Sequence, residues 1–351
     1  MKVAIATVQV PFIRGGAEVL ATSLRAALQS RGYAADVVTI PFKWYPSETL
    51  VQCMIAGRTL DLSEVNGDKI DIVIAMKFPA YFLRHDHKVV WLMHQHRQAY
   101  DLWQTRFGDI HTWPDGEILR DSIMRHDTNY LSEARRIYTI SENVTSRLRH
   151  YNSLDSTALY PPPDGHERLY CESYDDFVFY PSRIDPMKRQ RLLIEAARLL
   201  KSGMRVVIAG GGNETERLHL CTMIQEFGLA SRVSLVGFIS EDEKRSYYAR
   251  CRCVFFGGVD EDYGYVTLEA FYSRKPVVTL IDTGGALEFA IDGHNGYICE
   301  PDARSVAARL DELSEDRELA ERLGAEGHAT LAKKSIDWDH VTRSLVQLDS
   351  K

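Results

Sequence analysis

Short apolar runs alternate with amphipathic stretches along the 351-residue chain. In the first half the apolar runs predict buried strands, and the 3.6-residue spacing at 18–30 predicts an amphipathic helix. The predicted strands of this half are 3–8, 35–40, 70–75, 89–93 and 137–140. The run Tyr160-Pro161-Pro162-Pro163 then ends the pattern, because proline can continue neither a helix nor a central strand.

The same alternation restarts after the prolines. The second half contains predicted strands at 177–180, 206–209, 233–236, 253–256 and 276–280, with helices at 191–201 and 216–226. Repeated strand–helix units predict parallel sheets with right-handed crossovers. We therefore expect an α/β protein of two Rossmann-like domains that face a central cleft, with the proline run as the linker.

Composition agrees with this picture. The length exceeds one ordinary core, and 45% hydrophobic with 26% charged residues is usual for a globular protein. A formal charge of −7 argues against nucleic acid as a partner. The apolar start MKVAIATVQV is too short for a signal peptide, and no run approaches the roughly 18 apolar residues of a membrane span.

The six cysteines form no CxxC pair. Cys251 and Cys253 are expected to be buried free thiols on one face of a strand, which suits a reducing cytoplasm. We therefore predict a cytoplasmic protein, and any contact with the inner face of the membrane would be weak and peripheral.

In parallel α/β sheets ligands bind at the carboxyl ends of the strands, so the loops there are the candidates for function. Gly15 and Gly16 follow the first strand, where a ligand could approach the backbone closely, although a tight strand-to-helix turn explains them equally well. His94 and His96 follow the strand 89–93, and a structural role stays open for both. A zinc site there would need a third ligand that the sequence does not supply.

Arg183 and Lys188 follow the first strand of the second half, across a proline-containing turn. A guanidinium fork and an ammonium group aimed at one spot form a clamp for a diphosphate, and a solvated basic turn is the alternative. The glycines at 210–212 follow the next strand, but Thr215 breaks the G-x-G-x-x-G dinucleotide fingerprint. We interpret this segment as a turn that lines the site.

The most informative segment is EDYGYVTLE at 261–269. Glu261 and Glu269 flank a glycine-centred turn and an apolar run that begins a helix, whose first amides can bind phosphate while the carboxylates bind sugar hydroxyls. Asp260 and Asp262 also match the Asp-x-Asp pattern that elsewhere holds a divalent metal. Because fixed cations and helix amides can neutralise a diphosphate, we expect no metal and no other cofactor.

In order along the chain, these motifs resemble family 4 of the retaining glycosyltransferases, which has the GT-B fold. EDYGYVTLEA is similar to the E-x7-E segment of that family, with Asp262-Tyr263-Gly264 in place of the common Gly-Phe-Gly. The similarity continues through KPVVTLIDTGGALEF and DGHNGYICEPD, and Trp338 resembles the aromatic residue of a C-terminal helix that crosses back to the first domain. Ser182 and Arg189 depart from the family, which usually has glycine at both positions. The bulk of Arg189 is expected to narrow the nucleotide pocket or to add a phosphate contact.

The resemblance implies a role for each candidate residue. Glu269 would bind the ribose hydroxyls of the donor, and Glu261 and His94 would contact the transferred sugar. The loop 236–238 would hold the base through its backbone. The diphosphate would be held by a larger set of groups, which comprises Arg183, Lys188, the amides of Gly264, Tyr265 and Val266, and the Gly15-Gly16 loop.

The implied reaction is the transfer of a hexosyl group, with retained configuration, from a UDP- or GDP-linked donor to a glycan, a lipid-linked glycan or a small-molecule hydroxyl. The implied setting is surface polysaccharide assembly. The acceptor would bind domain 1–163 and the donor domain 164–335, while 336–351 would pack back on the first domain. Two alternatives stay open: an enzyme like the UDP-N-acetylhexosamine epimerases, and a noncatalytic sugar-nucleotide binding protein.

Aromatic residues are frequent in the N-terminal half, where the acceptor is expected. Sugar rings or the apolar part of a lipid-linked acceptor would pack on such faces, and ordinary core packing is the alternative for about half of them. These residues are Phe42, Trp44, Tyr45, Tyr81, Phe82, Tyr100, Trp103 and Trp113. Four arginines could contact anionic lipid, with a solvated helix face as the alternative, namely Arg135, Arg136, Arg147 and Arg149.

Overall fold

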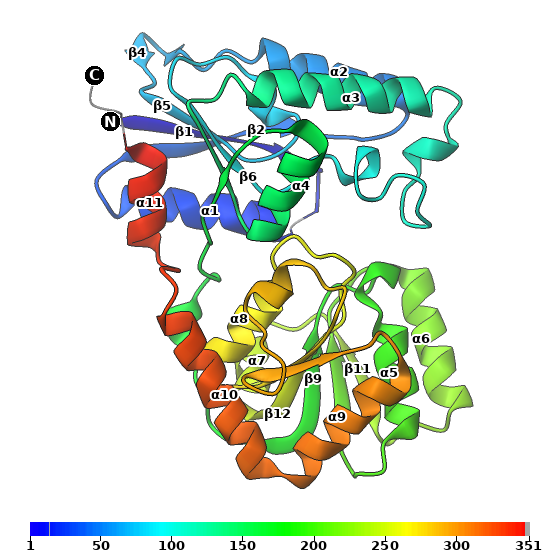
Figure 1. Ribbon diagram of the computed structural model, residues 1–351. Helices are drawn as coiled ribbons and strands as arrows, with labels where there is room; N and C mark the ends of the chain where they lie inside the picture. Colours follow the sequence, from blue (N-terminus) through cyan, green and yellow to red (C-terminus); the bar gives the residue numbers. More distant parts are fainter. Residues whose placement is uncertain (14, 348–351) are drawn as a thin grey trace. The chain divides into compact units, whose positions relative to one another are not determined.

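The structure is a computed structural model that describes residues 1–13 and 15–347. The chain divides into two compact units, one formed by Met1–Asp164 with Ile336–Lys351 and the other by Gly165–Ser335 (Figure 1). The end of the predicted C-terminal segment, 348–351, lies outside the described residues.

The first unit is built on a sheet of six parallel strands in the order β2-β1-β5-β6-β7-β8. The strands are β1 (Lys2–Gln9), β2 (Ala34–Pro41), β5 (Ile72–Ala75), β6 (Lys88–Leu92), β7 (Arg136–Thr139) and β8 (Thr157–Ala158). A separate antiparallel pair comprises β3 (Glu64–Val65) and β4 (Asp68–Lys69). The strand order reverses between β1 and β5, and such a switch point is where open α/β sheets bind ligands.

Helices of the first unit include the C-terminal segment of the chain. They are α1 (Gly16–Gln29), α2 (Ser47–Thr59), α3 (Gly116–Leu131), α4 (Glu142–Asn152) and α11 (Trp338–Val346). Helix α11 packs against α1 (Figure 1). The ring of Trp338 meets that of Trp91 edge-on, with 6.4 Å between centroids, and Arg31 Nε donates to Asp339 Oδ1 at 2.8 Å. These contacts confirm that the C-terminal helix returns to the first unit.

The second unit contains another sheet of six parallel strands, in the order β11-β10-β9-β12-β13-β14. Its strands are β9 (Asp175–Pro181), β10 (Arg205–Ala209), β11 (Val233–Gly237), β12 (Cys251–Phe256), β13 (Val277–Leu280) and β14 (Gly296–Cys299). Numbered from the first strand of the unit, this is the 3-2-1-4-5-6 order of the Rossmann fold, with its switch point between β9 and β12.

Helices cover both faces of the second sheet. They are α5 (Gln190–Leu199), α6 (Glu214–Glu226), α7 (Glu241–Arg250), α8 (Tyr265–Tyr272), α9 (Ala303–Glu315) and α10 (Arg317–Ala332). Helix α5 packs against α6 and α9, and α8 packs against α10. Polar caps start several helices: Ser240 Oγ accepts from Glu243 N before α7, and Asp302 Oδ1 accepts from Ser305 N before α9.

The two parallel sheets confirm the predicted α/β fold with two Rossmann-like units. Their central strands lie between helix layers, so these strands are mostly apolar and could be recognised in the sequence. All six residues of β12 are buried. Cys251 and Cys253 are buried free thiols, as expected. Among the helices that the structure describes, none is both long and apolar enough to span a membrane.

Candidate functional site

The switch point of the second unit brings together the loops that follow β9 and β12. The β9 loop carries Arg183 and Lys188, and the β12 loop carries Glu261 and leads into α8. Because the chain leaves these neighbouring strands toward opposite faces of the sheet, the two loops diverge and leave room for a ligand. The predicted diphosphate clamp and the predicted E-x7-E segment therefore lie at one place in the fold.

The β9 loop places Arg183 toward solvent and orders the turn behind it. The Arg183 side chain is 66% exposed, and its guanidinium lies 3.7 Å from the Asp185 carboxylate. Asp185 also accepts from Met187 N at 2.9 Å, which caps the short 3-10 helix Pro186–Lys188. Tyr180 donates its hydroxyl to the Lys188 carbonyl oxygen at 2.6 Å and fixes the end of this turn. The turn thus presents Arg183 and Lys188 from a defined backbone.

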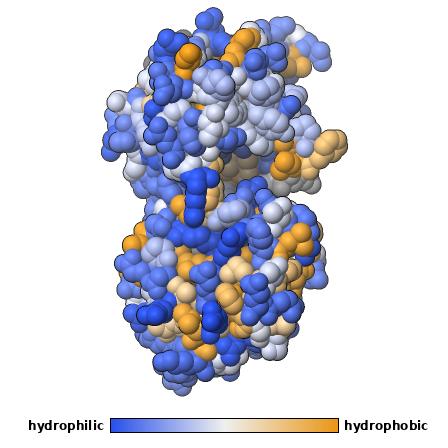
Figure 2. All heavy atoms as spheres, turned by 90° about the vertical axis from the view of Figure 1, so that its right-hand side faces the viewer, coloured by the Kyte–Doolittle hydropathy of each residue, from blue (hydrophilic) through white to orange (hydrophobic). Residues whose placement is uncertain are grey.

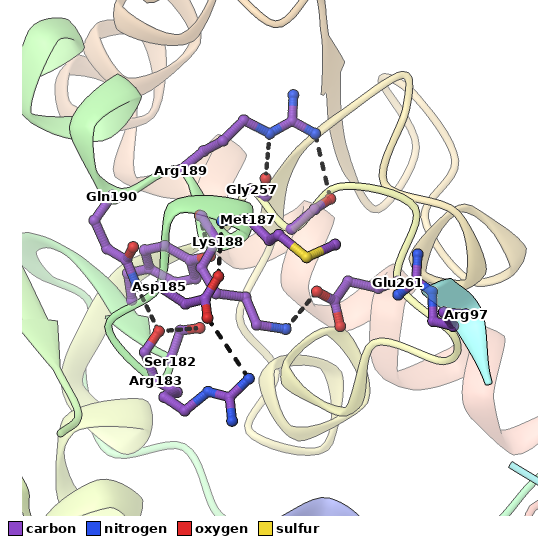
Figure 3. Close-up of polar contacts among 12 residues, drawn as sticks. Arg97, Ser182, Arg183, Asp185, Met187, Lys188, Arg189, Gln190, Gly257 and Glu261 are labelled. Carbon is purple, nitrogen blue, oxygen red and sulfur yellow. Dashed lines mark hydrogen bonds and ion pairs between the residues drawn. The ribbon is translucent and has the colours of Figure 1, made fainter. Parts of the chain in front are cut away.

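Lys188 and Glu261 are joined directly. Lys188 Nζ donates a hydrogen bond to Glu261 Oε1, and Figure 3 shows the lysine chain extended toward that carboxylate. The two side chains are 20% and 18% exposed. The pair therefore neutralises its own charges in a partly desolvated position where an anionic ligand can still reach the ammonium group.

Arg189 occupies the position where the family usually has glycine, and its backbone explains that usage. Its φ of 55° lies in the left-handed region, which glycine adopts at no steric penalty. Arg189 Nε donates to the Gly257 carbonyl oxygen at 2.7 Å, and the guanidinium binds both oxygens of Asp282 at 2.7 and 3.1 Å. In Figure 3 this side chain runs away from Arg183 and Lys188. Arg189 therefore ties three loops together, a role that the sequence did not suggest.

The glycine turn after β10 packs against the Arg183 loop. A Cβ at Gly210 would lie 2.1 Å from the Ser182 carbonyl oxygen, and one at Gly212 would lie 2.4 Å from the Ile184 carbonyl oxygen. Gly210 N also donates to the Gly237 carbonyl oxygen at 2.7 Å, which joins the turn to the loop after β11. These glycines are required for close packing of neighbouring loops.

The start of α8 is built from two loops that hydrogen-bond to each other. Glu261 N donates to the Thr283 carbonyl oxygen at 3.0 Å, and Gly285 N donates to the Glu261 carbonyl oxygen at 2.8 Å. Gly264, with a φ of 84°, caps the helix, and a Cβ there would lie 2.9 Å from Ala286 Cβ. The first turn of α8, which contains Tyr265 and Val266, thus begins beside Glu261 and directs its positive dipole end to the same edge of the sheet.

Glu269 lies one turn further along α8 and is held by α7. Its Oε1 accepts from Lys244 Nζ at 3.1 Å, and its Oε2 accepts from the Tyr248 hydroxyl at 2.7 Å. The Glu269 side chain is 13% exposed. Burial, followed by the charge of Glu269, raises the pKa of Tyr248 well above its usual value, so this phenol remains a hydrogen-bond donor.

In the first unit, Gly15 and Gly16 lie at the switch point, where the loop after β1 leads into α1 and Gly16 is the first helical residue. A Cβ at Gly16 would meet no atom within 4 Å, and one at Gly15 would lie 3.5 Å from Glu18 Oε2. Neither residue is among those with positive φ. Gly15 is the N-cap residue of α1, where glycine is among the favoured residues, and a side chain at Gly16 would meet no clash, in contrast to the glycines at 210 and 212.

His94 follows β6 and has a defined tautomer. Its Nδ1 lies 2.6 Å from the Gln95 carbonyl oxygen, and because a carbonyl can only accept, Nδ1 carries the proton. In the neutral ring Nε2 is then the acceptor. The Gln95 side chain is buried and donates to Asn152 Oδ1, so the segment that carries His94 is anchored in the interior of the unit.

His96 and the two aspartates beside Glu261, Asp260 and Asp262, are residue types that bind metals elsewhere. Burial, together with the charges of His94 and Lys77, lowers the pKa of His96 to about 3, and its ring stacks on Phe78 with 5.2 Å between centroids. His96 is thus a neutral packing residue. Within residues 1–13 and 15–347, His, Cys, Asp and Glu side chains form no group of three or more that could hold a metal ion.

The predicted aromatic residues of the N-terminal half differ in how deeply they are buried. Four of them belong to the core and cannot receive an acceptor, namely Phe42, Tyr81, Phe82 and Tyr100. Tyr45 is 50% exposed and lies under the Lys43 ammonium group, 4.8 Å from its ring centroid. The others are half-buried: Trp44, Trp103 and Trp113. The alternative of core packing therefore holds for half of the set.

The four arginines do not form one exposed basic group. Arg147 is 7% exposed, and Arg149 pairs with Asp155 at 3.3 Å. Arg135 and Arg136 donate to backbone carbonyl oxygens of other segments, at 2.6 and 2.9 Å. Figure 2 shows apolar residues scattered among hydrophilic ones on the visible face.

Sequence reasoning missed Lys244, Tyr248 and Asp282. Lys244 and Tyr248 belong to a charged, weakly amphipathic helix, and only the packing of α7 beside α8 brings them to Glu269. Asp282 lies within the segment KPVVTLIDTGGALEF, directly after a buried strand, and that position was a usable signal.

Residues 171–330 match the family model described as Glycosyl transferases group 1. The Alpha-1,3/1,6-mannosyltransferase ALG2 of Dictyostelium discoideum is 30% identical over 133 residues, which cover 36% of this chain and 31% of that protein. The lipopolysaccharide core biosynthesis glycosyltransferase LpsE of Rhizobium meliloti is 26% identical over 347 residues, which cover 95% of each chain. Against three of the curated relatives that it matches, two of them ALG2 proteins, the chain spans 31%, 42% and 49% of their length.

The fold agrees with that of a solved glycosyltransferase. Sucrose-phosphate synthase from Thermosynechococcus elongatus superimposes with a TM-score of 0.78 at 18% identity, and the match covers 97% of each chain. The protein therefore has the GT-B fold. The relatives named above are glycosyltransferases, and the family model covers nearly all of the second unit.

Proposed function

We propose that the protein is a retaining glycosyltransferase of the family 4 type, which moves a hexosyl group from a UDP- or GDP-linked donor to a hydroxyl acceptor. One observation carries the proposal. Arg183 and Lys188 lie on the loop after β9, Lys188 contacts Glu261 on the loop after β12, and that second loop leads into the N-terminus of α8. Two cations, helix amides and a carboxylate are the groups that a nucleoside diphosphate sugar requires.

In this proposal the second unit binds the donor. Arg183 and Lys188, with the amides of Gly264, Tyr265 and Val266, hold the diphosphate. Glu269 accepts hydrogen bonds from the ribose, and the loop 236–238 holds the base. In the first unit, Gly15 and Gly16 leave space for close approach of a ligand to the backbone, and His94 contacts the transferred sugar.

We propose that the diphosphate needs no metal ion. The exposed guanidinium of Arg183 and the ammonium group of Lys188 supply fixed positive charge. The dipole of α8 adds roughly half an elementary charge at its N-terminus. Such preorganised groups stabilise the departing diphosphate without reorganisation when the bond breaks.

The chemical step follows from these assignments. The bond between the anomeric carbon and the phosphate oxygen breaks, and the acceptor oxygen bonds to the same face of the sugar. The leaving phosphate oxygen takes the acceptor proton, so no side chain is assigned as general base. Glu261 and His94 position the hydroxyls of the sugar near the reacting carbon.

We place the acceptor on the first unit and the reaction in cytoplasmic assembly of a surface glycan. The full-length similarity to a protein named for lipopolysaccharide core biosynthesis supports this setting. Exposed Tyr45 and half-buried Trp44, whose rings lie 5.1 Å apart, are the best-placed aromatic surface for a sugar ring. Contact with the inner face of the membrane, where a lipid-linked acceptor would lie, is part of this proposal.

The experiment that tests the proposal follows donor consumption and product stereochemistry. Purified protein is incubated with UDP- and GDP-sugars, with and without lipid-linked and free glycan acceptors, in EDTA. We expect acceptor-dependent release of one nucleoside diphosphate, with an α-linked product from an α-linked donor by proton NMR. Acceptor-free conversion of the donor to its epimer would indicate an epimerase, and tight binding without turnover would indicate a noncatalytic binding protein.

A further inference from the structure

Lys244 lies beside Glu269 and has no role in the assignments above. It stands in the first turn of α7, and its Nζ donates to Glu269 Oε1 at 3.1 Å and to Glu241 Oε2 at 2.8 Å. The Tyr248 hydroxyl holds the second oxygen of Glu269 at 2.7 Å. Glu269 is therefore fixed from two sides by α7.

The hydrogen-bond capacity of this group exceeds the contacts that it makes within the protein. An ammonium group has three N–H donors, and the contacts described for Lys244 use two of them. Each carboxylate oxygen of Glu269 has two acceptor positions, and the contacts with Lys244 and Tyr248 use one each. The Lys244 and Glu269 side chains are 22% and 13% exposed, so solvent reaches both. The pair presents a donor and acceptors side by side.

The charge of Lys244 is maintained by its neighbours. Burial acts to lower the pKa of this ammonium group, but the carboxylates of Glu269 and Glu241 outweigh burial, and the pKa is raised overall. Lys244 therefore stays protonated at neutral pH. It lies near the carboxyl edge of the sheet, because α7 begins directly after the loop that follows β11.

We propose that Lys244 is a second ribose contact, which donates to one hydroxyl oxygen of the 2′,3′-diol while Glu269 accepts from that diol. This inference rests on the proposed function, under which Glu269 binds the ribose of the donor. A vicinal diol offers both donors and acceptors, and the Lys244–Glu269 pair is complementary to it. A ribose that lacks the contacted hydroxyl leaves the third donor of this partly buried ammonium group without an acceptor, which is how a polar site rejects a deoxy analogue.

The consequence is selectivity for ribonucleotides. Because hydrogen bonds to charged groups are among the stronger ones, we expect loss of the Lys244 contact to weaken binding about tenfold. The affinity should fall for the ribonucleotide and for the deoxy form that keeps the contacted hydroxyl. The affinity for the other deoxy form should not change. A lysine that merely supports the packing of α7 on α8 would change the affinity for all nucleotides by the same factor.

The test measures dissociation constants by calorimetry for UDP, GDP and the 2′-deoxy and 3′-deoxy forms of the better ligand. For the wild-type protein we expect at least about tenfold preference for the ribonucleotide. In Lys244→Met the preference over one deoxy form should fall about tenfold. Glu241→Gln, which removes the other partner of Lys244, should keep the wild-type preference, and so should Lys244→Arg, which retains the charge and the donors.

The outcomes distinguish a failure of the proposed Lys244 contact from a failure of the proposed donor site. An unchanged ribose-to-deoxyribose preference in Lys244→Met overturns the role of Lys244 and leaves the donor site standing. Failure of the wild-type protein to bind any nucleoside diphosphate overturns the proposed function and this inference together. If Lys244→Met does not fold, judged by its melting curve without ligand, Lys244→Leu, which also has no donor, replaces it, with the same expected loss of preference.

Discussion

Lys188 donates from Nζ to Oε1 of Glu261, so the proposed phosphate-binding cation and the proposed sugar-binding carboxylate are partners of each other. Both side chains are at least four-fifths buried. A donor that binds here must draw Lys188 at least partly away from Glu261. The pair therefore lowers the affinity of the site for a bare diphosphate, while it holds both side chains in place for the complete donor.

This competition predicts opposite effects of one substitution on binding and on turnover. In Glu261→Gln the carboxylate no longer competes for Lys188, so we expect UDP or GDP to bind more tightly. An ion pair of this exposure is worth on the order of 1 kcal/mol, or about fivefold in the dissociation constant. Sugar transfer should fall by at least about a hundredfold, because the group that contacts the sugar loses its negative charge. Calorimetry and a transfer assay measure the two effects.

Asp262→Asn is the matched control for this prediction. It removes the same formal charge one residue away from Glu261 without removing the partner of Lys188. It should improve diphosphate affinity by less than Glu261→Gln does. Weaker binding of the diphosphate to Glu261→Gln than to the wild-type protein would contradict the competition.

A second prediction concerns the pair of Arg189 and Asp282, which joins the loops after β9 and β13. We expect Arg189→Gln and Asp282→Asn to be non-additive, with a coupling free energy of about 1 kcal/mol. The value is modest because Asp282 is 46% exposed and water screens the pair. Urea unfolding of the wild-type protein, both single variants and the double variant gives this coupling. Strict additivity would show that the two side chains do not stabilise the loops jointly.

The third prediction concerns pH and the buried Asp127 of α3. Burial raises the pKa of this carboxyl to about 7, although Tyr100 donates its hydroxyl to Oδ2 at 2.7 Å. In the unfolded chain the carboxyl ionises near its ordinary pKa of 3.8. The folded state therefore loses stability relative to the unfolded chain as the pH rises from about 4 to about 7, and the loss is constant above that range.

Asp127→Asn removes this titration and keeps the shape of the side chain. Its melting temperature relative to wild type should rise between pH 5 and pH 7 and then level off. Asp121→Asn, at an exposed position of the same helix, should give a difference that is small at every pH. A pH-independent difference for Asp127→Asn would mean that the carboxyl does not titrate with a raised pKa.

Several elements could be predicted from the sequence for a simple physical reason. Strands that lie between two helix layers are apolar along most of their length, so the apolar runs within β1, β6 and β12 were evident in the sequence. Strand β8 has two residues and lies at the edge of its sheet, so it left no such signal. Helix α7 has an almost wholly polar sequence, and its stability comes from its capping box at Ser240 and from packing.

Sequence analysis could predict only those site residues that lie close together along the chain. Glu261, Gly264 and Glu269 share one short segment, so their spacing could be recognised. The partners that hold them come from other segments: Lys244 is 25 positions from Glu269, and Arg189 is 93 positions from Asp282. The left-handed backbone conformation of Arg189 could not be predicted either, because an arginine in the sequence does not indicate a positive φ as a glycine does.

A metal-independent nucleoside diphosphate site in the second unit is the central element of the proposed function. We would therefore first measure thermal shifts of the wild-type protein, Lys188→Met and Glu269→Ala with UDP, GDP and ADP in EDTA. One diphosphate at about 100 times its dissociation constant should add roughly 2.7 kcal/mol of apparent stability to the wild-type protein. We expect both substitutions to abolish this shift at the same ligand concentration. A wild-type protein that responds to no diphosphate, or responds only when Mg²⁺ replaces EDTA, would contradict the proposed site.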